Sequence, residues 1–287
     1  MLWFILSLIG AVFDACYYAF IKKYVKGQND YVLASGMFLG GGIILFLLTA
    51  FNGIPSIQPG FTQALIGTVL INIVATILYF NALHMTDLSL CTPMLSFSPI
   101  FLIFTSFFML GELPTRYGMG GIALIVIGTY ILNTTNNHTS MLDPLREIVK
   151  NKGVMYMLLV TFLFSFTSNF DKQVVVSSDP LFGTAMIETS LGIAFLSISL
   201  WKKKDVINEY AKNYRKYMLG GLIIALISWT VGTALTLQIV PYVVSVKRVS
   251  ILFSVLLGAH LFREKHIINK LIGAAIVLIG VVLILVF

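Results

Sequence analysis

Apolar runs of about 20 residues alternate with short polar stretches along the whole chain. A helix needs about 20 mainly apolar residues to cross the hydrocarbon core of a bilayer. The pattern therefore predicts an all-α integral membrane protein with ten transmembrane helices. The expected helices cover residues 2–21, 31–51, 61–83, 89–110 and 117–133, and then residues 153–171, 180–200, 217–237, 241–262 and 267–287.

The second half of the chain repeats the first. Residues 82–132 align without a gap with residues 234–284, and each segment holds an apolar helix, a Glu-bearing turn and another apolar helix. The register pairs Ala82 with Ala234, Leu83 with Leu235, Ser98 with Ser250, Phe101 with Phe253, Glu112 with Glu264, Gly121 with Gly273, and Gly128 with Gly280. With five helices in each copy, the second copy enters the bilayer upside down. This is the inverted-repeat plan of transporters with a central site.

The longest polar stretch, residues 133–152, lies where a linker between two copies is expected. The predicted domains are a five-helix repeat over residues 1–135, a linker over 136–152 and a second five-helix repeat over 153–287. The first apolar run begins at Leu2 without a basic segment before it. It also carries Asp14, so we interpret it as a retained helix rather than a cleaved signal peptide.

The amino-acid composition supports a chain that is embedded in a lipid bilayer. Hydrophobic residues make up 58% of the chain and charged residues 11%, and the mean hydropathy is +0.93. Soluble domains carry about 25% charged residues. Ten helices of spanning length use most of the 287 residues, so the sequence leaves no room for a separate soluble domain.

The net charge of +7 does not indicate a nucleic-acid partner, because Lys and Arg lie mostly between the apolar runs. Basic residues in such loops set membrane orientation. One set of alternate loops is basic: Lys22, Lys23 and Lys26; Arg146, Lys150 and Lys152; Lys202, Lys203, Lys204, Lys212, Arg215 and Lys216; Arg263, Lys265 and Lys270. The opposite loops hold little beyond Arg116 and Lys172. The positive-inside rule places the first set in the cytoplasm and both termini outside.

Ionisable residues inside transmembrane helices cost at least about 2.5 kcal/mol each, so they are the first candidates for a functional site. Lys247 and Arg248 lie about two turns into the ninth expected helix. One interpretation is a cationic clamp for a carboxylate or phosphate of the substrate. The other is a structural ion pair with an acid of another helix, for which the candidates are Asp14, Asp171 and Glu188.

Polar side chains form further stripes at helical spacing, and their convergence would line a central cavity. The substrate-binding candidates are Lys247, Arg248, Asp14, Tyr18, Asn72, Tyr79, Ser96, Ser168, Asn169, Trp229, Thr233 and Tyr242. For a single Ser or Thr, a hydrogen bond to its own or a neighbouring helix is the alternative. Pro93 and Pro99 remove backbone donors from the fourth helix and predict a hinge or break there.

Asp14 and Glu188 are also candidates for proton coupling, because a carboxylate removed from water binds a proton more readily. No His-Glu metal box, Walker loop, nucleophile elbow or zinc-ligand spacing occurs in the sequence. Cys16 and Cys91 both fall inside expected helices and indicate neither a disulfide framework nor a metal site. We therefore expect a protein that is not an enzyme and that uses no cofactor or metal.

Taken together, these residues resemble the drug/metabolite transporter superfamily in its ten-helix form with two EamA-type domains. The features that carry the resemblance are Ala82-Leu83, Gly111-Glu112 and Gly128 in the first copy, and Ala234-Leu235, Glu264 and Gly280 in the second. The second copy departs from the pattern at Arg263, where the first has Gly111. The resemblance implies a central substrate cavity lined by helices one, three, four, six, eight and nine. It also implies cytoplasmic termini, which conflicts with the Lys and Arg count.

The leading hypothesis is a secondary active exporter of a small polar metabolite, such as an amino acid or a related carboxylate-bearing compound. It would work by alternating access about a central site, in a lipid bilayer, as a monomer or homodimer. A multidrug exporter would instead hold aromatic cations on Trp229 and Tyr79, with Asp14 or Glu188 as the counter-charge. A magnesium-type ion pathway would need acidic and carbonyl groups along a pore. A purely structural membrane protein fits poorly with polar residues on several transmembrane helices.

Overall fold

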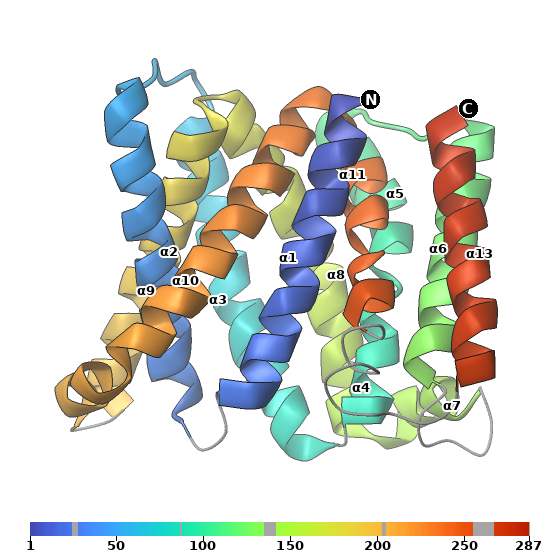
Figure 1. Cartoon of the computed structure of the whole chain (residues 1–287), viewed down its shortest axis with the longest axis horizontal. Coiled ribbons are helices and arrows are strands. Elements are labelled where there is room, and N and C mark those ends of the chain that lie inside the picture. The colour runs from blue at the N-terminus through green and yellow to red at the C-terminus, as the bar shows by residue number, and fades with distance from the viewer. Residues whose placement is uncertain (25–27, 87, 135–141, 203–204, 255–266, 287) are drawn as a thin grey trace.

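The computed structural model describes residues 1–287 except 25–27, 87, 135–141, 203–204, 255–266 and 287 (Figure 1). All regular elements in these described residues are helices. In chain order they are α1 (Leu2–Tyr24), α2 (Asp30–Asn52), α3 (Phe61–Met85), α4 (Leu88–Leu95), α5 (Ser98–Leu110), α6 (Arg116–Thr134), α7 (Asp143–Lys150), α8 (Lys152–Val176), α9 (Pro180–Lys202), α10 (Val206–Leu237), α11 (Val240–Lys247) and α13 (Ile267–Val286).

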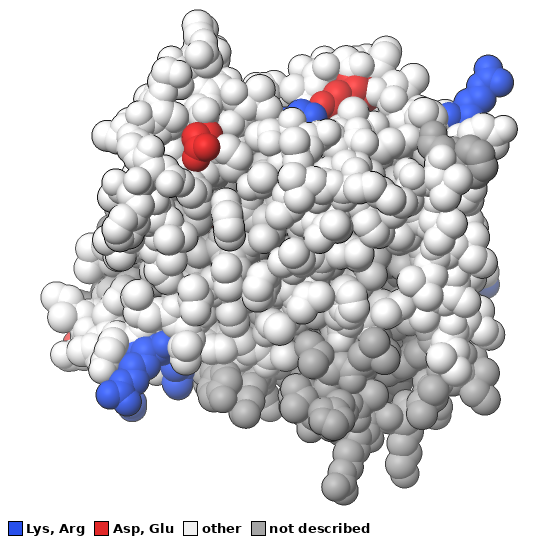
Figure 2. Space-filling model, turned by 45° about the horizontal axis from the view of Figure 1, so that its top comes forward, with Lys and Arg blue, Asp and Glu red and all other residues white. Residues whose placement is uncertain are grey.

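Seven stretches in the described residues are helical, long and apolar enough to cross a membrane, and α6 and α13 contain two shorter apolar helices. Figure 2 shows the surface that results, in which uncharged residues cover most of the visible face and charged groups lie near its edges. The prediction of an all-α, multi-pass membrane protein is confirmed. The count of ten stays a prediction, because residues 255–266 and the aligned Glu264 lie outside the described part of the chain.

The fourth predicted helix is broken where proline predicted it. α4 contains Pro93 and ends at Leu95, and α5 begins at Ser98. Between them the backbone makes a tighter turn, in which the N–H of Ser96 donates to the carbonyl of Pro93 at 3.2 Å. Pro99, near the start of α5, has no N–H to donate to the carbonyl of Leu95, so the regular ladder is interrupted here and the break has a local cause.

A second break occurs at the aligned position of the second copy. α11 ends at Lys247, and residues 250–254 are helical again. In the turn between them, the N–H of Val249 donates to the carbonyl of Val246 at 3.0 Å. The prediction of one continuous helix from residue 241 is wrong here. Neither Pro nor Gly lies at the break, so only the comparison with the first copy could have indicated it.

Two pairs of equivalent helices from the two halves, α6 with α13 and α2 with α9, pack against each other in antiparallel orientation. α6 lies beside α13 along their length (Figure 1). Gly121 approaches the carbonyl of Gly280, and Gly128 approaches the carbonyl of Gly273. The alignment pairs Gly121 with Gly273 and Gly128 with Gly280, so exchanging the halves converts one contact into the other. A two-fold axis in the membrane plane produces this relation, as an inverted repeat requires.

α2 and α9 also pack through a pair of contacts that are interconverted when the two halves are exchanged. Each has 23 residues, and Gly42 packs on Thr189 while Leu39 packs on Gly192. Small residues bring helix backbones close together in lipid, where the hydrophobic effect gives no drive for association. Around this pair, stacked aromatic rings fill the core, with Phe38 and Phe195 5.9 Å apart between centroids.

Both chain termini lie at one end of the helix bundle, and α7 lies at the opposite end (Figure 1). The described basic loops join helices at the α7 end, in agreement with the alternation of Lys and Arg along the sequence. Which end faces the cytoplasm stays a prediction.

We expect Gly121→Ala to destabilise the fold. An added Cβ would lie 2.7 Å from the carbonyl oxygen of Gly280, which forces α6 away from α13. Overpacking of this kind costs about 1–3 kcal/mol. The matched control is Gly120→Ala, because a Cβ there meets nothing within 4 Å. Unfolding of both variants in mixed micelles tests this, and equal stabilities would contradict the packing account.

Candidate functional site

A cavity of about 120 Å³ lies between α8, α9, α10 and α11. Five polar side chains line it: Asp171, Thr184, Glu188, Ser228 and Lys247. The remaining lining is apolar, and includes Val175, Ile187, Ile227, Val231 and Leu235. Two acids and one base in an apolar wall are costly in a membrane, which marks this cavity as the candidate functional site.

Glu188 is held in the cavity by one of its two oxygens. It lies on α9, one turn after Thr184, and only 7% of its surface is exposed. The hydroxyl of Ser228 on α10 donates to Oε1. Oε2 is buried and has no hydrogen-bond partner among the described residues. A carboxylate oxygen accepts hydrogen bonds, so Oε2 is open to a proton or to an ammonium group.

Asp171 is positioned from α3. The hydroxyl of Thr68 donates to its Oδ1 at 2.5 Å, and the side-chain amide of Asn72 donates to the oxygen of that hydroxyl at 3.0 Å. Asn72 was predicted to bind substrate. The structure places it behind Asp171, where its hydrogen bond orients Thr68.

Lys247 is the last residue of α11 and the one cation among the described residues that line the cavity. Within the described residues it makes no ion pair or hydrogen bond. It interacts electrostatically with both Asp171 and Glu188 across the cavity. The structural ion pair considered from the sequence is therefore not closed in this structure, and the ammonium group stays available.

Arg248 follows Lys247 directly but lies in a different environment. Its Nε donates to the hydroxyl of Ser98 at 2.9 Å, which joins the second helix break to the start of α5. Arg248 also interacts electrostatically with Tyr18 on α1. The two adjacent cations are thus divided between the cavity and the α1–α5 side.

A second polar cluster surrounds Asp14 on α1. Asp14 is 8% exposed and interacts electrostatically with Tyr17 and Tyr18. Tyr79 on α3 interacts with the same two tyrosines. Asp14, Tyr79 and Arg248 thus lie within electrostatic reach of Tyr18, whereas the convergence of all the predicted polar stripes on one cavity stays a prediction.

Three predicted residues form hydrogen bonds within one helix or between two helices. The amide of Asn169 donates to the hydroxyl of Thr105 at 3.0 Å, and its Oδ1 accepts from Ser106 at 2.7 Å, so it ties α8 to α5. The hydroxyls of Ser168 and Thr233 donate to carbonyls of their own helices.

Three further predicted residues lie outside the cavity lining. Ser96 is fully buried at the first helix break. Trp229 is 41% exposed on α10. The hydroxyl of Tyr242 accepts the backbone N–H of Thr115 at 2.9 Å, and its ring stacks on Trp3. Tyr242 therefore anchors the start of α11 to the chain that precedes α6.

The sequence did not reveal the contacts that position α11. Glu112 Oε1 and Lys172 Nζ form an ion pair at 2.5 Å, and Glu112 Oε2 accepts the N–H of Val240 at 2.8 Å. Lys172 also donates to the carbonyl of Gln238 at 2.7 Å. A carboxylate is favourable at a helix N-terminus. These contacts hold the first turn of α11 in place. They thereby also position Lys247, which lies two turns further along the helix.

Thr184 and Ser228 were also missed, because each is a common helix residue without a motif. The available signal was spacing: Thr184 lies four residues before Glu188, so both share one face of α9.

The sequence pattern of the EamA-like transporter family matches residues 1–134 and 151–286. A search of curated proteins found no match. A solved crystal structure has a similar fold, with a TM-score of 0.78 at 15% identity over 98% of this chain and 98% of its own. At that identity the likeness concerns the fold alone.

We expect Glu112 and Lys172 to be energetically coupled. A double-mutant cycle with Glu112→Gln and Lys172→Met should give a coupling free energy of about 1–3 kcal/mol, because both side chains are largely shielded from water. The control cycle uses Asp30→Asn and His84→Gln, an exposed pair with a 2.6 Å contact, whose coupling should stay below about 1 kcal/mol. Equal coupling in both cycles would contradict a special role for the Glu112 cluster.

Proposed function

The chain belongs to the EamA-like transporter family of the drug/metabolite transporter superfamily, and from this membership we propose a secondary active exporter of a small polar metabolite. Membership favours transport over catalysis. The observation that supports the finer proposal is the cavity in which Lys247 lies between α8, α9 and α10 with Asp171 and Glu188.

The charges of the cavity fit a zwitterion such as an amino acid. The ammonium of Lys247, which has no ion-pair partner among the described residues, suits a carboxylate, with which it would form a charge-assisted hydrogen bond. The free oxygen of Glu188 suits the substrate's ammonium group. A related carboxylate-bearing compound would use Lys247 in the same way.

Size and charge favour this proposal over the alternatives. Sites for drug-sized ligands measure about 300–1,000 Å³, whereas this cavity has about 120 Å³. A multidrug exporter would need a larger space in this state. A magnesium pathway would bring a divalent cation close to Lys247, whose charge repels it.

Alternating access is the proposed mechanism. The two helix breaks lie at aligned positions, 96–97 and 248–249, and the bond between Arg248 and Ser98 joins their surroundings. Half-helices that meet at such breaks can change direction while the rest of each helix stays intact. We propose that the repeats, residues 1–135 and 153–287, move about this region as a monomer or homodimer, connected by residues 136–152.

Proton coupling is proposed to run through Glu188 in preference to Asp14. With all three groups ionised, the cavity carries two negative charges and one positive charge, so one additional positive charge balances it. A proton and the substrate's ammonium group can each supply that charge, one at a time. Asp14 lies outside this cavity lining, in the cluster with Tyr17 and Tyr18, so it is not placed to balance the charge beside Lys247.

Lys247→Met should weaken amino-acid binding by about ten- to a hundredfold, because a hydrogen bond between charged groups contributes about 1.5–3 kcal/mol. Lys150→Met is the control, since Lys150 is exposed at the end of α7. Thermal shifts of purified protein with a panel of common amino acids measure the affinities. Stabilisation by aromatic cations alone, unaffected by Lys247→Met, would contradict the proposed substrate.

Glu188→Gln should abolish uptake driven by a pH gradient while preserving exchange at saturating substrate across proteoliposome membranes, because the amide oxygen still accepts a hydrogen bond although it binds the substrate's ammonium group less tightly. Glutamine still accepts the hydrogen bond from Ser228 but cannot carry a proton. Both assays are run on the same vesicles with a radiolabelled amino acid. If Glu188→Gln retains pH-driven accumulation, the assignment of Glu188 to proton coupling is wrong.

A further inference from the structure

α10 is too long and too polar at its start to lie wholly in hydrocarbon. Its 32 residues extend about 48 Å at 1.5 Å per residue, whereas the hydrocarbon core is about 30 Å thick. The charged residues end at Lys216, so the first three turns lie at the membrane interface. In Figure 1 this end of α10 projects at the lower left, beside the end of α9.

The outward face of these turns has two rows. Ile207 and Tyr214, 78% and 54% exposed, form an apolar row that continues into the exposed Met218. Lys212 and Arg215 form the adjacent row, and both are exposed. Apolar and basic rows side by side are typical of helices that lie on anionic membrane surfaces.

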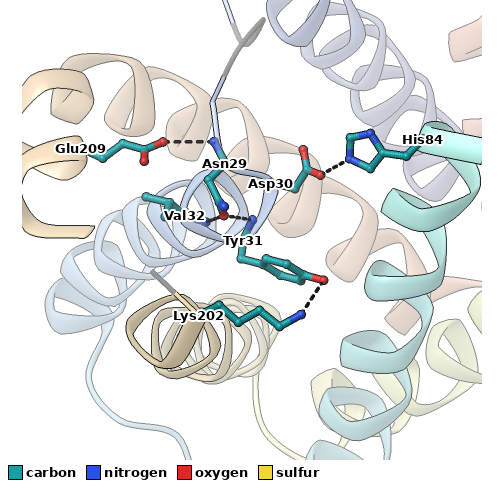
Figure 3. Close-up of polar contacts among 7 residues, drawn as sticks. All are labelled: Asn29, Asp30, Tyr31, Val32, His84, Lys202 and Glu209. Atoms are coloured by element: carbon teal, nitrogen blue, oxygen red, sulfur yellow. Dashed lines mark hydrogen bonds and ion pairs between the residues drawn. The ribbon is translucent and has the colours of Figure 1, made fainter. Parts of the chain in front are cut away.

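The acid of this segment is turned away from the basic row. Glu209 accepts the backbone N–H of Asn29 at 3.1 Å, and Figure 3 shows its carboxylate directed at that residue. Lys202 is also engaged inward, donating to the hydroxyl of Tyr31 at 3.1 Å (Figure 3). Within the described residues neither Lys212 nor Arg215 forms an ion pair with a carboxylate, and Lys212 makes no hydrogen bond either.

The guanidinium of Arg215 is oriented by its neighbour. Its Nε donates to the hydroxyl of Tyr214 at 3.0 Å, and its Cζ lies 5.7 Å from the ring centroid. Held in this way, it still has free N–H groups for a phosphate. Figure 2 shows Lys and Arg gathered at the lower left edge, where this part of α9 and α10 lies.

We propose that the first three turns of α10 bind anionic phospholipid headgroups of the leaflet at this end. Lys212 and Arg215 contact the phosphodiester, and Ile207, Tyr214 and Met218 pack on the upper acyl chains. Each basic side chain near an anionic surface favours binding by about fivefold. This binding is independent of the substrate cavity and of the proposed transport reaction.

Trp201 provides a local probe, because it is 85% exposed and lies five residues before the start of α10. With Trp3→Phe and Trp229→Phe it becomes the chain's one tryptophan. The full-length protein is placed in bilayers of phosphatidylcholine and phosphatidylglycerol of constant composition. Bromine, which quenches tryptophan fluorescence, is carried either by the phosphatidylglycerol or by an equal amount of the phosphatidylcholine.

We expect brominated phosphatidylglycerol to quench Trp201 more strongly than brominated phosphatidylcholine. Lys212→Gln with Arg215→Gln should remove this excess, whereas Lys150→Gln with Lys152→Gln, an equal loss of charge at the same end, should retain it. Salt at 1 M, where the Debye length is about 3 Å, should also remove the excess without any substitution. Equal quenching by the two lipids in the parent protein, or an excess that survives the Lys212 and Arg215 substitutions, would overturn the proposal.

Discussion

Close backbone contact between equivalent helices is the interaction on which the structure depends. Lipid provides no hydrophobic drive for helix association, so packing and hydrogen bonds must hold the bundle together. Gly121 and Gly128 bring α6 against α13, and Gly42 and Gly192 bring α2 against α9. Because each contact is repeated by exchange of the halves, the same few glycines fix both the packing and the pseudo-two-fold axis.

The pseudo-two-fold axis relates the two interrupted helices, which are α4 with α5 in the first half and α11 with residues 250–254 in the second half. Each is interrupted by a short turn, and the bond between Arg248 and Ser98 links the two regions. The start of α11 is fixed independently by Glu112 and Lys172. Lys247 is therefore placed by contacts at both ends of one short helix, which hold its ammonium group in the cavity with Asp171 and Glu188.

Sequence periodicity was sufficient for the long apolar helices, and proline for the break between Pro93 and Pro99, because both follow from local composition. Periodicity did not predict α7, which lies in the expected linker, or the first eleven residues of α10, whose helix was expected to begin at residue 217. It did not give the break at 248–249, which lacks Pro and Gly. The sequence analysis also treated Lys247 and Arg248 as one clamp. Successive residues of a helix point about 100° apart, and here Lys247 faces the cavity whereas Arg248 donates to Ser98. Asn169 and Tyr242 were candidates for the cavity because they are polar. Only tertiary contacts show that one joins α8 to α5 and the other anchors α11.

The central claim is that the cavity around Lys247 is reached in turn from both sides of the membrane. Val231→Cys, on the cavity wall, in a chain with Cys16→Ser and Cys91→Ser, tests this with a membrane-impermeant thiol reagent applied to inside-out or right-side-out vesicles. The account predicts modification from either side, each much faster than at Val160→Cys, which is fully buried on α8. Modification from one side alone, or from neither, would contradict it.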